Sequence, residues 1–260
     1  MEGETKIVLV LEYEGTNYCG FQFQENAPSI QNEIEKALLK LTGEETRVVA
    51  ASRTDSGVHA AGQVVCLRTG CGLKIESFVS GLNYYLPPDI AVLESYQVNS
   101  QFNVQRDAVS REYRYLILNT RMRSALKRTY TYQVSGELDV EAMNRACEEL
   151  IGEHDLASFI TAFKQSIIRS TLRKINRARF ERKGKLVVFN IEANSFLPHQ
   201  VRNTVGALIQ VGRGKIDREG FREILEAKKP GLAGPTVPAQ GLFLTKVNYS
   251  RPLGDYYEDL

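Results

Sequence analysis

Apolar and polar positions alternate along the chain with two periods, one typical of strands and one typical of helices. Runs that are apolar or alternate every second residue predict strands over 6–13, 47–52, 63–69, 90–98, 111–118, 172–182, 185–194 and 241–249. Apolar residues at helical spacing predict helices over 30–42, 77–86, 140–151, 199–212 and 217–229. Ser29 and Asp139 are suitable N-caps, and Gly43 ends the first of these helices.

Each half of the chain therefore follows the order β-α-β-β-α-β, which is the order of the ferredoxin-like unit. The two halves share no sequence identity, so the repeat is one of architecture. We predict an α+β fold in which two ferredoxin-like units form a mixed, mainly antiparallel sheet, with helices on one face and a cleft between the halves. A boundary within 99–110 gives an N-terminal domain of residues 1–105 and a C-terminal domain of residues 106–260.

Composition and the cysteine pattern predict the cellular compartment. Of the 260 residues, 43% are hydrophobic and 25% are charged, which is typical of a globular protein in water. The four cysteines form no CxxC pair, so a disulfide framework is not expected. The N-terminal apolar run from Ile7 to Leu11 is too short for a signal sequence or a membrane span. We therefore expect a reduced, cytoplasmic protein that is not associated with a membrane.

Positive charge is concentrated although the net charge is only +2. One stretch holds seven basic residues and a single acid, Glu181: Arg169, Arg173, Lys174, Arg177, Arg179, Arg182 and Lys183. Such a strand could simply be a solvated sheet edge. Arginine outnumbers lysine five to two there, however, and the planar guanidinium suits phosphate, which favours nucleic acid. A second basic group follows the strand 111–118: Arg121, Arg123, Lys127 and Arg128.

The stretch ASRTDSGVHAAGQVV, residues 50–64, contains one carboxylate among small and apolar residues. Asp-Ser-Gly is good turn material, because Asp can hydrogen-bond the nearby backbone and Gly57 tolerates a positive φ. On that pattern alone Asp55 reads as a turn residue.

Several motifs change this interpretation. RTDSGVHAAGQV resembles the motif G-R-T-D-A-G-V-H-A-x-G-Q-V of the TruA family of tRNA pseudouridine synthases. Further stretches resemble other motifs of that family, in family order: LEYEGTNYCGFQFQ, SIQNEIEKAL, NYYLPPDIAV, SREYRYLI, HDLASF, FLPHQVRNTVG and PAQGLFL. The main departure is FNVQRDAV, residues 102–109, where the family has F-H-A-R-F. Its arginine is either shifted to Arg106 or replaced by Gln105.

The resemblance implies isomerisation of uridine to pseudouridine in the anticodon stem-loop of tRNA, at tRNA positions 38–40. Asp55 stands at the family's catalytic aspartate, and attack on carbon and abstraction of a sugar proton both remain open as its role. The reaction requires no cofactor, and none is expected. The three histidines are far apart in the sequence and predict no metal site. His59 and His199 are interpreted as structural residues.

The resemblance also assigns roles to four other residues. Arg202 matches the arginine that pairs with the catalytic aspartate, and Arg53 the residue associated with base flipping. Tyr113 matches the tyrosine that stacks on the target uracil, and Leu242 a leucine of the same pocket. Without the motifs, Tyr113 and Leu242 would read as core residues and Arg202 as a surface charge.

The expected partners are tRNA and a second copy of the chain, since the resemblance implies a homodimer. Arg173, Arg177 and Arg179 are the predicted RNA-binding residues of the basic strand. Two alternatives stay open: an RNA chaperone that binds tRNA without chemistry, and a metal-dependent hydrolase that uses Asp55 and His59.

Overall fold

The structure is a computed structural model that describes residues 4–161 and 170–257. These residues form two compact units. The first unit consists of the residues up to Ser110 together with those from Leu244 onward, and the second consists of Arg111–Phe243. Each unit is described by itself. Arg169, the first residue of the predicted basic stretch, lies outside the described residues.

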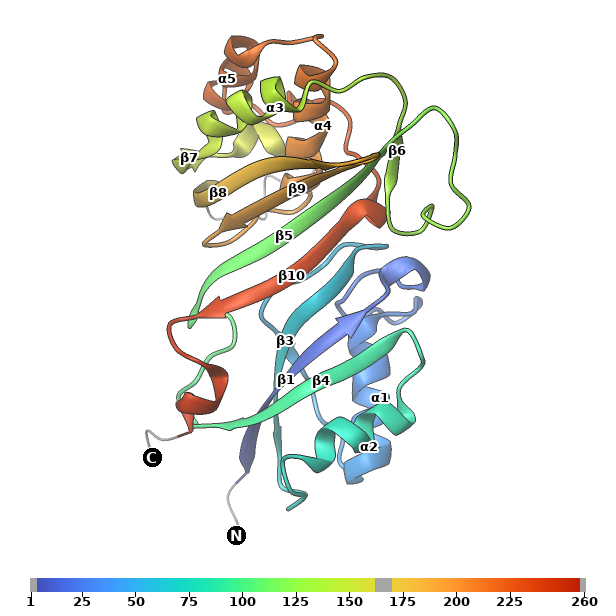
Figure 1. Cartoon of the computed structure of the whole chain (residues 1–260). Coiled ribbons are helices and arrows are strands. Elements are labelled where there is room, and N and C mark those ends of the chain that lie inside the picture. The colour runs from blue at the N-terminus through green and yellow to red at the C-terminus, as the bar shows by residue number, and fades with distance from the viewer. Residues whose placement is uncertain (1–3, 162–169, 258–260) are drawn as a thin grey trace. The chain divides into compact units, whose positions relative to one another are not determined.

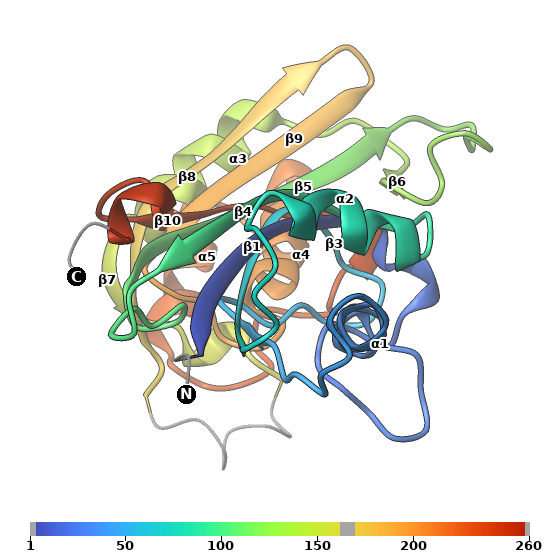
Figure 2. The ribbon, with the colours of Figure 1, turned by 90° about the horizontal axis from the view of Figure 1, so that it is seen from below.

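The first unit contains the predicted β-α-β-β-α-β order. Its elements are β1 (Thr5–Tyr13), α1 (Ile30–Thr42), β2 (Val49–Ala50), β3 (His59–Thr69), α2 (Ser77–Tyr85) and β4 (Ile90–Val98). Strand β1 pairs antiparallel with both β3 and β4. Helices α1 and α2 contact each other, and α2 lies against β4 (Figures 1 and 2).

Local capping explains where α1 begins and ends. The Ser29 hydroxyl accepts a hydrogen bond from the Asn32 amide, and Gly43 follows the helix with φ of 77°, a conformation that favours glycine. The buried side chains of α1, which include Ile34 and Leu38, fall at helical spacing and face the core. The prediction for this helix is confirmed.

Strand β2 is shorter than predicted: side chains satisfy backbone groups of Val48 and Ser52, although the Ala51 amide still donates to the Val64 carbonyl of β3 at 2.8 Å. The Val48 amide donates to Glu35 Oε1 on α1 at 3.1 Å, and the Ser52 carbonyl accepts from Gln63 Nε2 at 2.7 Å. Only Val49 and Ala50 pair with β3. Ala51 and Ser52 instead begin the loop that carries Asp55.

The second half of the chain repeats the same order with additions. Its elements are β5 (Ala108–Asn119), β6 (Tyr132–Val134), α3 (Val140–Cys147), β7 (Gly152–Asp155), β8 (Leu172–Lys183), β9 (Leu186–Ala193), α4 (Gln200–Gly212), α5 (Arg218–Glu226) and β10 (Leu242–Tyr249). Strands β6 and β7 were not expected from the sequence. Asp139 caps α3 as predicted, but α3 ends at Cys147 and a 3-10 turn completes the segment.

The pairing in the second unit is mainly antiparallel. Strand β9 pairs antiparallel with β5 and β8, β8 pairs antiparallel with β7, and β6 alone runs parallel to β5. Helix α3 contacts α4, α5 and β8, so the three helices gather on one side of β8 and β9 (Figure 1). The α+β class and the mainly antiparallel pairing are therefore confirmed. No helix among the described residues has the length and apolar character that a membrane crossing requires.

Candidate active site

The loop between β2 and β3, residues 51–58, carries Asp55 and is called the Asp55 loop below. The Val58 amide donates to the Asp55 carbonyl at 3.1 Å, and Gly57 has φ of 76°. Asp-Ser-Gly therefore does form a turn, as its residue types predict. Asp55 is half-buried in this turn, and Arg53 is exposed two residues before it.

A second segment, Tyr18–Phe21, holds the Asp55 loop along its backbone. The Phe21 amide donates to the Thr54 carbonyl at 3.1 Å, and the Gly57 amide donates to the Tyr18 carbonyl at 3.3 Å. Gly20 has φ of 100°, and an added Cβ there would lie 2.9 Å from the Thr54 carbonyl oxygen. Glycine is thus required at this position for both its backbone conformation and the close approach of the loop.

Hydrogen bonds from buried side chains also hold the Asp55 loop. The hydroxyls of Tyr13 and Thr54 are hydrogen-bonded at 2.8 Å. Gln63, which is fully buried, donates from Nε2 to the Ser52 carbonyl and, at 3.3 Å, to the Tyr13 hydroxyl. A buried polar group without a partner is costly, so these bonds define one position for the loop.

His59 completes the support of the loop. It is only 1% exposed, and its Nδ1 accepts a hydrogen bond from the Gly15 amide at 3.0 Å. Gly15 is itself tightly enclosed, since an added Cβ would lie 2.0 Å from the Val58 carbonyl oxygen. These contacts support the structural interpretation of His59. The described residues also hold no group of three or more His, Cys, Asp or Glu side chains arranged for a metal ion.

In the second unit, Tyr113 lies on β5 opposite Ile191 of β9. It is 6% exposed, and its ring packs edge-on against Phe196 with the ring centres 5.0 Å apart. Leu242, the first residue of β10, is also buried. Both residues are therefore buried in the second unit, and their role in a uracil pocket stays a prediction.

Arg202 lies in the first turn of α4, and its Nε donates to the Val237 carbonyl at 2.8 Å. The next carbonyl, that of Pro238, accepts from the Tyr115 hydroxyl at 2.7 Å. Burial raises the pKa of Tyr115, and the positive charge of Arg202 partly opposes that rise. The segment before β10 thus orients Arg202 and Tyr115 through adjacent carbonyls.

Asp55 and Arg53 belong to the first unit, whereas Tyr113, Arg202 and Leu242 belong to the second. The structure supports each set within its own unit. The pairing of Asp55 with Arg202 stays a prediction.

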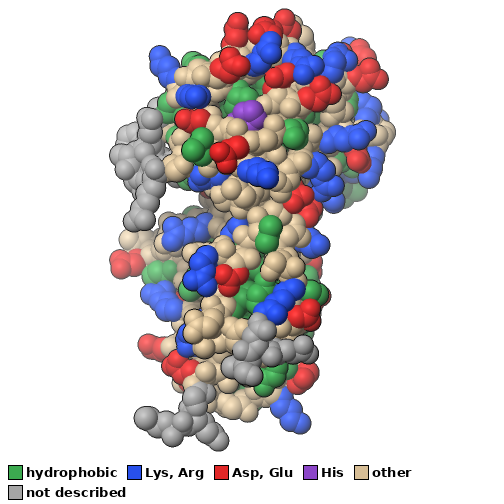
Figure 3. All heavy atoms as spheres, turned by 90° about the vertical axis from the view of Figure 1, so that its left-hand side faces the viewer, with side chains coloured by type: hydrophobic (Ala, Val, Ile, Leu, Met, Phe, Trp, Pro, Cys, Tyr) green, Lys and Arg blue, Asp and Glu red, His purple; other side chains and the backbone are tan. Residues whose placement is uncertain are grey.

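Two arginines of the basic strand β8 already have hydrogen-bond partners within the protein. Arg177 donates to Glu112 on β5 at 3.3 Å, and Arg173 donates to the Ser170 and Leu172 carbonyls. Burial lowers the pKa of Arg173. Arg179 is exposed, and its side chain has no hydrogen bond or ion pair to another described residue. Basic and acidic side chains are mixed over the face that Figure 3 presents.

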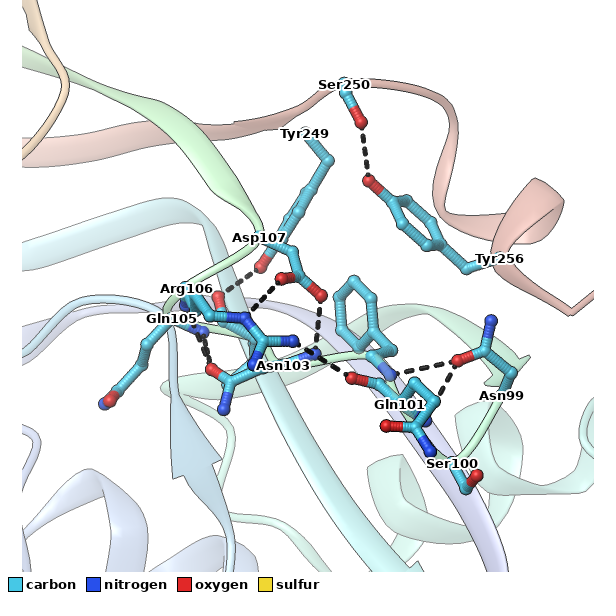
Figure 4. A network of polar contacts seen from close by, with 12 residues as sticks. Asn99, Ser100, Gln101, Asn103, Gln105, Arg106, Asp107, Tyr249, Ser250 and Tyr256 are labelled. Carbon is cyan, nitrogen blue, oxygen red and sulfur yellow. Dashed lines mark hydrogen bonds and ion pairs between the residues drawn. The ribbon is translucent and has the colours of Figure 1, made fainter. Parts of the chain in front are cut away.

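Residues 102–107 of the segment FNVQRDAV form a loop whose polar groups mostly bond to one another, and the last two residues begin β5 (Figure 4). Arg106 pairs with Asp107 at 3.0 Å and donates to the Gln101 carbonyl, while Asn103 Oδ1 accepts from the Gln105 and Arg106 amides. Gln105 Nε2 donates to the Ala50 carbonyl of β2 at 2.9 Å. Arg106 is therefore engaged within its own loop, and Gln105 is the residue that reaches the strand before Asp55.

Sequence reasoning missed four supporting groups. The Tyr115 hydroxyl and the Val237 and Pro238 carbonyls were assigned no role from the sequence. The signal lies in the motif PAQGLFL, which begins at Pro238 and places a fixed backbone turn before Leu242. Gln63 was likewise quoted within a motif without a function, although it supports the Asp55 loop.

Comparison with known proteins matches the chain to the family model described as tRNA pseudouridine synthase, over residues 9–105 and 146–250. tRNA pseudouridine synthase A of Acetivibrio thermocellus is 43% identical over 243 residues, which are 94% of this chain and 99% of the relative. The protein of the same name from Myxococcus xanthus is 42% identical over 245 residues, 94% of this chain and 92% of the relative.

Among solved structures, the crystal structure of the archaeal box H/ACA sRNP Nop10-Cbf5 complex is similar over 79% of this chain and 44% of that chain. Its identity is 11% and its TM-score 0.39, too low to carry an argument. The family model and the relatives do carry one, since the model matches residues 9–105 and 146–250 and each of the two relatives covers 94% of the chain. This chain belongs to the tRNA pseudouridine synthase family.

Proposed function

We propose that this protein isomerises uridine to pseudouridine in tRNA, at positions 38–40 of the anticodon stem-loop. The observation that carries the proposal is the match to the family over nearly the whole chain, together with an Asp55 loop that the fold holds in one position. Residues 1–105 would supply the catalytic loop, and residues 106–260 the RNA-binding surface.

In the proposed reaction the N-glycosidic bond of the uridine is broken, the uracil turns, and C5 is joined to the same ribose carbon. Asp55 acts as an ionised carboxylate, either on that carbon or on a proton of the sugar. Arg202 would form an ion pair with the Asp55 carboxylate. The proton on C5 is lost when the new bond forms and N1 takes up a proton, so no atom is gained or lost overall and the step requires no co-reactant.

The other residues would bind and orient the target nucleotide. Tyr113 would stack on the uracil, an interaction worth about 1–3 kcal/mol for a single base. Leu242 would pack against the same base, and Arg53 would fill the space that the base leaves in the stem. Arg179 would contact phosphate, with Arg173 and Arg177 contributing less because their guanidinium groups already have partners in the protein.

Two further properties belong to this proposal. We propose a homodimer, which sedimentation velocity would detect as a species of twice the chain mass, and a cytoplasmic location, where tRNA is available.

The decisive experiment replaces Asp55 with alanine. Asp55→Ala is expected to abolish pseudouridine formation on a tRNA with uridine at positions 38, 39 and 40, while tRNA affinity and the unfolding midpoint stay near the wild-type values. Chemical mapping of pseudouridine at each position provides the measurement. Activity of the variant within a few-fold of wild type would refute the proposal.

Ser56→Ala is the matched control in the same loop. Ser56 is exposed and its hydroxyl makes one hydrogen bond, to the Tyr18 carbonyl at 3.2 Å. Its loss should cost about 1 kcal/mol of stability or less and leave activity close to wild type. A non-catalytic tRNA-binding protein would instead show no modification by any of the three proteins.

A further inference from the structure

The loop between β5 and β6, residues 120–131, contains the second basic group of the sequence and is called the basic arm below. No acidic residue occurs between Glu112 and Glu137, whereas five basic residues do. Four of the five lie in the arm: Arg121, Arg123, Lys127 and Arg128. The proposed site residues include none of them.

The arm is held firmly where it leaves the sheet. Gln133 Nε2 donates to the Thr120 and Arg121 carbonyls, both at 3.2 Å, and Asn119 Nδ2 donates to the Val134 carbonyl at 3.0 Å. Farther along, the Thr131 hydroxyl donates to the Lys127 carbonyl at 2.8 Å. The arm is therefore a shaped projection of the second unit, and Figure 1 shows it extending beyond the ends of β5 and β6.

The outer part of the arm points its charges into solvent. Arg121, Arg123 and Lys127 are exposed, and their side chains make no hydrogen bond or ion pair with any other described residue. Leu126 is 90% exposed and Met122 77%. The arm thus presents unpaired positive charge together with two exposed apolar side chains.

This combination matches the surface of an RNA stem. A nucleic acid backbone offers a negative charge at every nucleotide, and a contact with it releases counterions. A protein partner without matching acids would instead bury these cations at a cost. The apolar side chains would meet ribose and base surfaces between the phosphates.

Position also supports a role in binding tRNA. Tyr130 of the arm packs its ring against Phe243, the neighbour of Leu242, with the ring centres 6.4 Å apart. Tyr113 lies six residues before the end of β5 at Asn119, a rise of about 20 Å, and the arm begins beyond that end. The arm would therefore contact nucleotides away from the target uridine.

We propose that the basic arm is a second tRNA-binding element, in which Arg121, Arg123 and Lys127 contact phosphates and Leu126 packs against the nucleotide between them. The proposal rests on the proposed function, because it takes tRNA as the ligand. It adds a surface of the second unit, at the far end of β5 from Tyr113, that determines affinity and leaves the chemical step to the residues already described.

The test uses the full chain with Asp55→Ala, so that tRNA is bound without being converted. The dissociation constant for tRNA is measured as a function of salt for this protein and for a variant that also carries Arg121→Gln, Arg123→Gln and Lys127→Gln. We expect affinity about tenfold or more weaker and a salt slope reduced by about one for each lost phosphate contact. Leu126→Ser should weaken binding about threefold without changing the slope.

The matched control removes three exposed charges elsewhere in the same unit, with Arg145→Gln, Arg213→Gln and Lys215→Gln. It changes the net charge by the same amount and should leave the affinity within about twofold to threefold of its parent. An equal loss in both triple variants would show a general effect of charge and overturn the proposal.

A footprint on the parent protein gives a readout that does not depend on how the variants fold. Lys127 should be protected from amine acylation by bound tRNA, whereas Lys215 should react equally with and without it. Equal acylation of Lys127 in both conditions would overturn the proposal, as would unchanged tRNA binding combined with a changed oligomeric state. A wild-type protein that forms no pseudouridine would sink the proposed function without altering either binding measurement.

Discussion

The Asp55 loop and the basic arm are both connections between strands, yet they differ in how many of their groups are hydrogen-bonded to the rest of the protein. The Asp55 loop is bonded along its backbone to Tyr18–Phe21 and from below to the side chains of Tyr13 and Gln63. The basic arm is bonded where it joins the sheet and within itself, and three of its charged side chains are left to solvent.

The difference follows from what each task requires. A carboxylate that reacts with one atom must be held at one position, because a displacement of about 1 Å can cost a factor of about 100 in rate. Phosphate contacts tolerate movement, since charge attraction falls off gradually with distance. Strand β8 lies between these cases, with Arg177 paired to Glu112 and Arg179 unpaired among the described residues.

Apart from removal of Asp55 itself, the largest effect on the Asp55 loop is expected from Gly20→Ala in the neighbouring segment Tyr18–Phe21. The backbone at Gly20 has φ of 100°, and an added Cβ would lie 2.9 Å from the Thr54 carbonyl oxygen. The unfavourable backbone conformation should cost about 1–2 kcal/mol of stability. The displaced Thr54 should lower the single-turnover rate of pseudouridine formation by about 100-fold.

Gly43→Ala separates the two causes. Gly43 also has a positive φ, 77°, but no other atom lies within 4 Å of the position of an added Cβ. This variant should lose about 1–2 kcal/mol of stability and keep its activity. Equal activity in the two variants would contradict the view that the fold fixes Asp55 through Gly20.

An intermediate effect is expected from Tyr115→Phe in the second unit. The change leaves the Pro238 carbonyl without its donor at 2.7 Å, at a cost of about 1–3 kcal/mol at pH 8. Because the same segment binds Arg202, activity should fall several-fold more than in Tyr96→Phe. Tyr96 lies in the first unit and its hydroxyl donates to exposed Glu94.

The pH dependence of that stability difference has a definite sign. Burial raises the pKa of Tyr115 in the folded protein above its usual value near 10. The contribution of the hydroxyl is complete below pH 10 and is lost as pH rises from there toward the folded pKa. Denaturant unfolding at pH 8 and pH 10.5 should therefore show a smaller difference between wild type and Tyr115→Phe at the higher pH.

The smallest effects are expected on β8, where Arg177 and Arg179 lie on the same face two residues apart. Arg179→Gln should weaken tRNA binding a few-fold and lower the salt slope by about one. Arg177→Gln should change the slope less, because Glu112 already neutralises part of its charge, and should cost less than about 1 kcal/mol of stability. A larger change in slope for Arg177→Gln would reverse this ranking.

Much of the fold could be predicted from local patterns. The periodicity located β1, α1, β4, β8 and β9 to within a residue or two, and Ser29 and Asp139 cap their helices as expected. The motifs identified the loop of Asp55 and its family. These features depend on neighbours in sequence, so a single chain is enough to reveal them.

Other features depend on residues far apart in the sequence. Hydrogen bonds to Glu35 and Gln63 flank the short β2, and β6 forms through parallel pairing with β5. The return of residues from Leu244 onward to the first unit has no local signal either, although Tyr249 and Tyr256 pack against Phe102 there.

The order of the elements, the turn at Asp55 and the family to which the chain belongs can all be predicted from the sequence alone. Only the tertiary structure shows which charged side chains are free to bind RNA. Arg177 and Arg106 are paired within the protein, whereas the outer side chains of the basic arm lie in solvent. The tertiary structure also decided how Asp55 is held, through Gly20, Tyr13 and Gln63. The reason is physical: residue type fixes what a side chain can bond, but only packing determines which partner lies within reach.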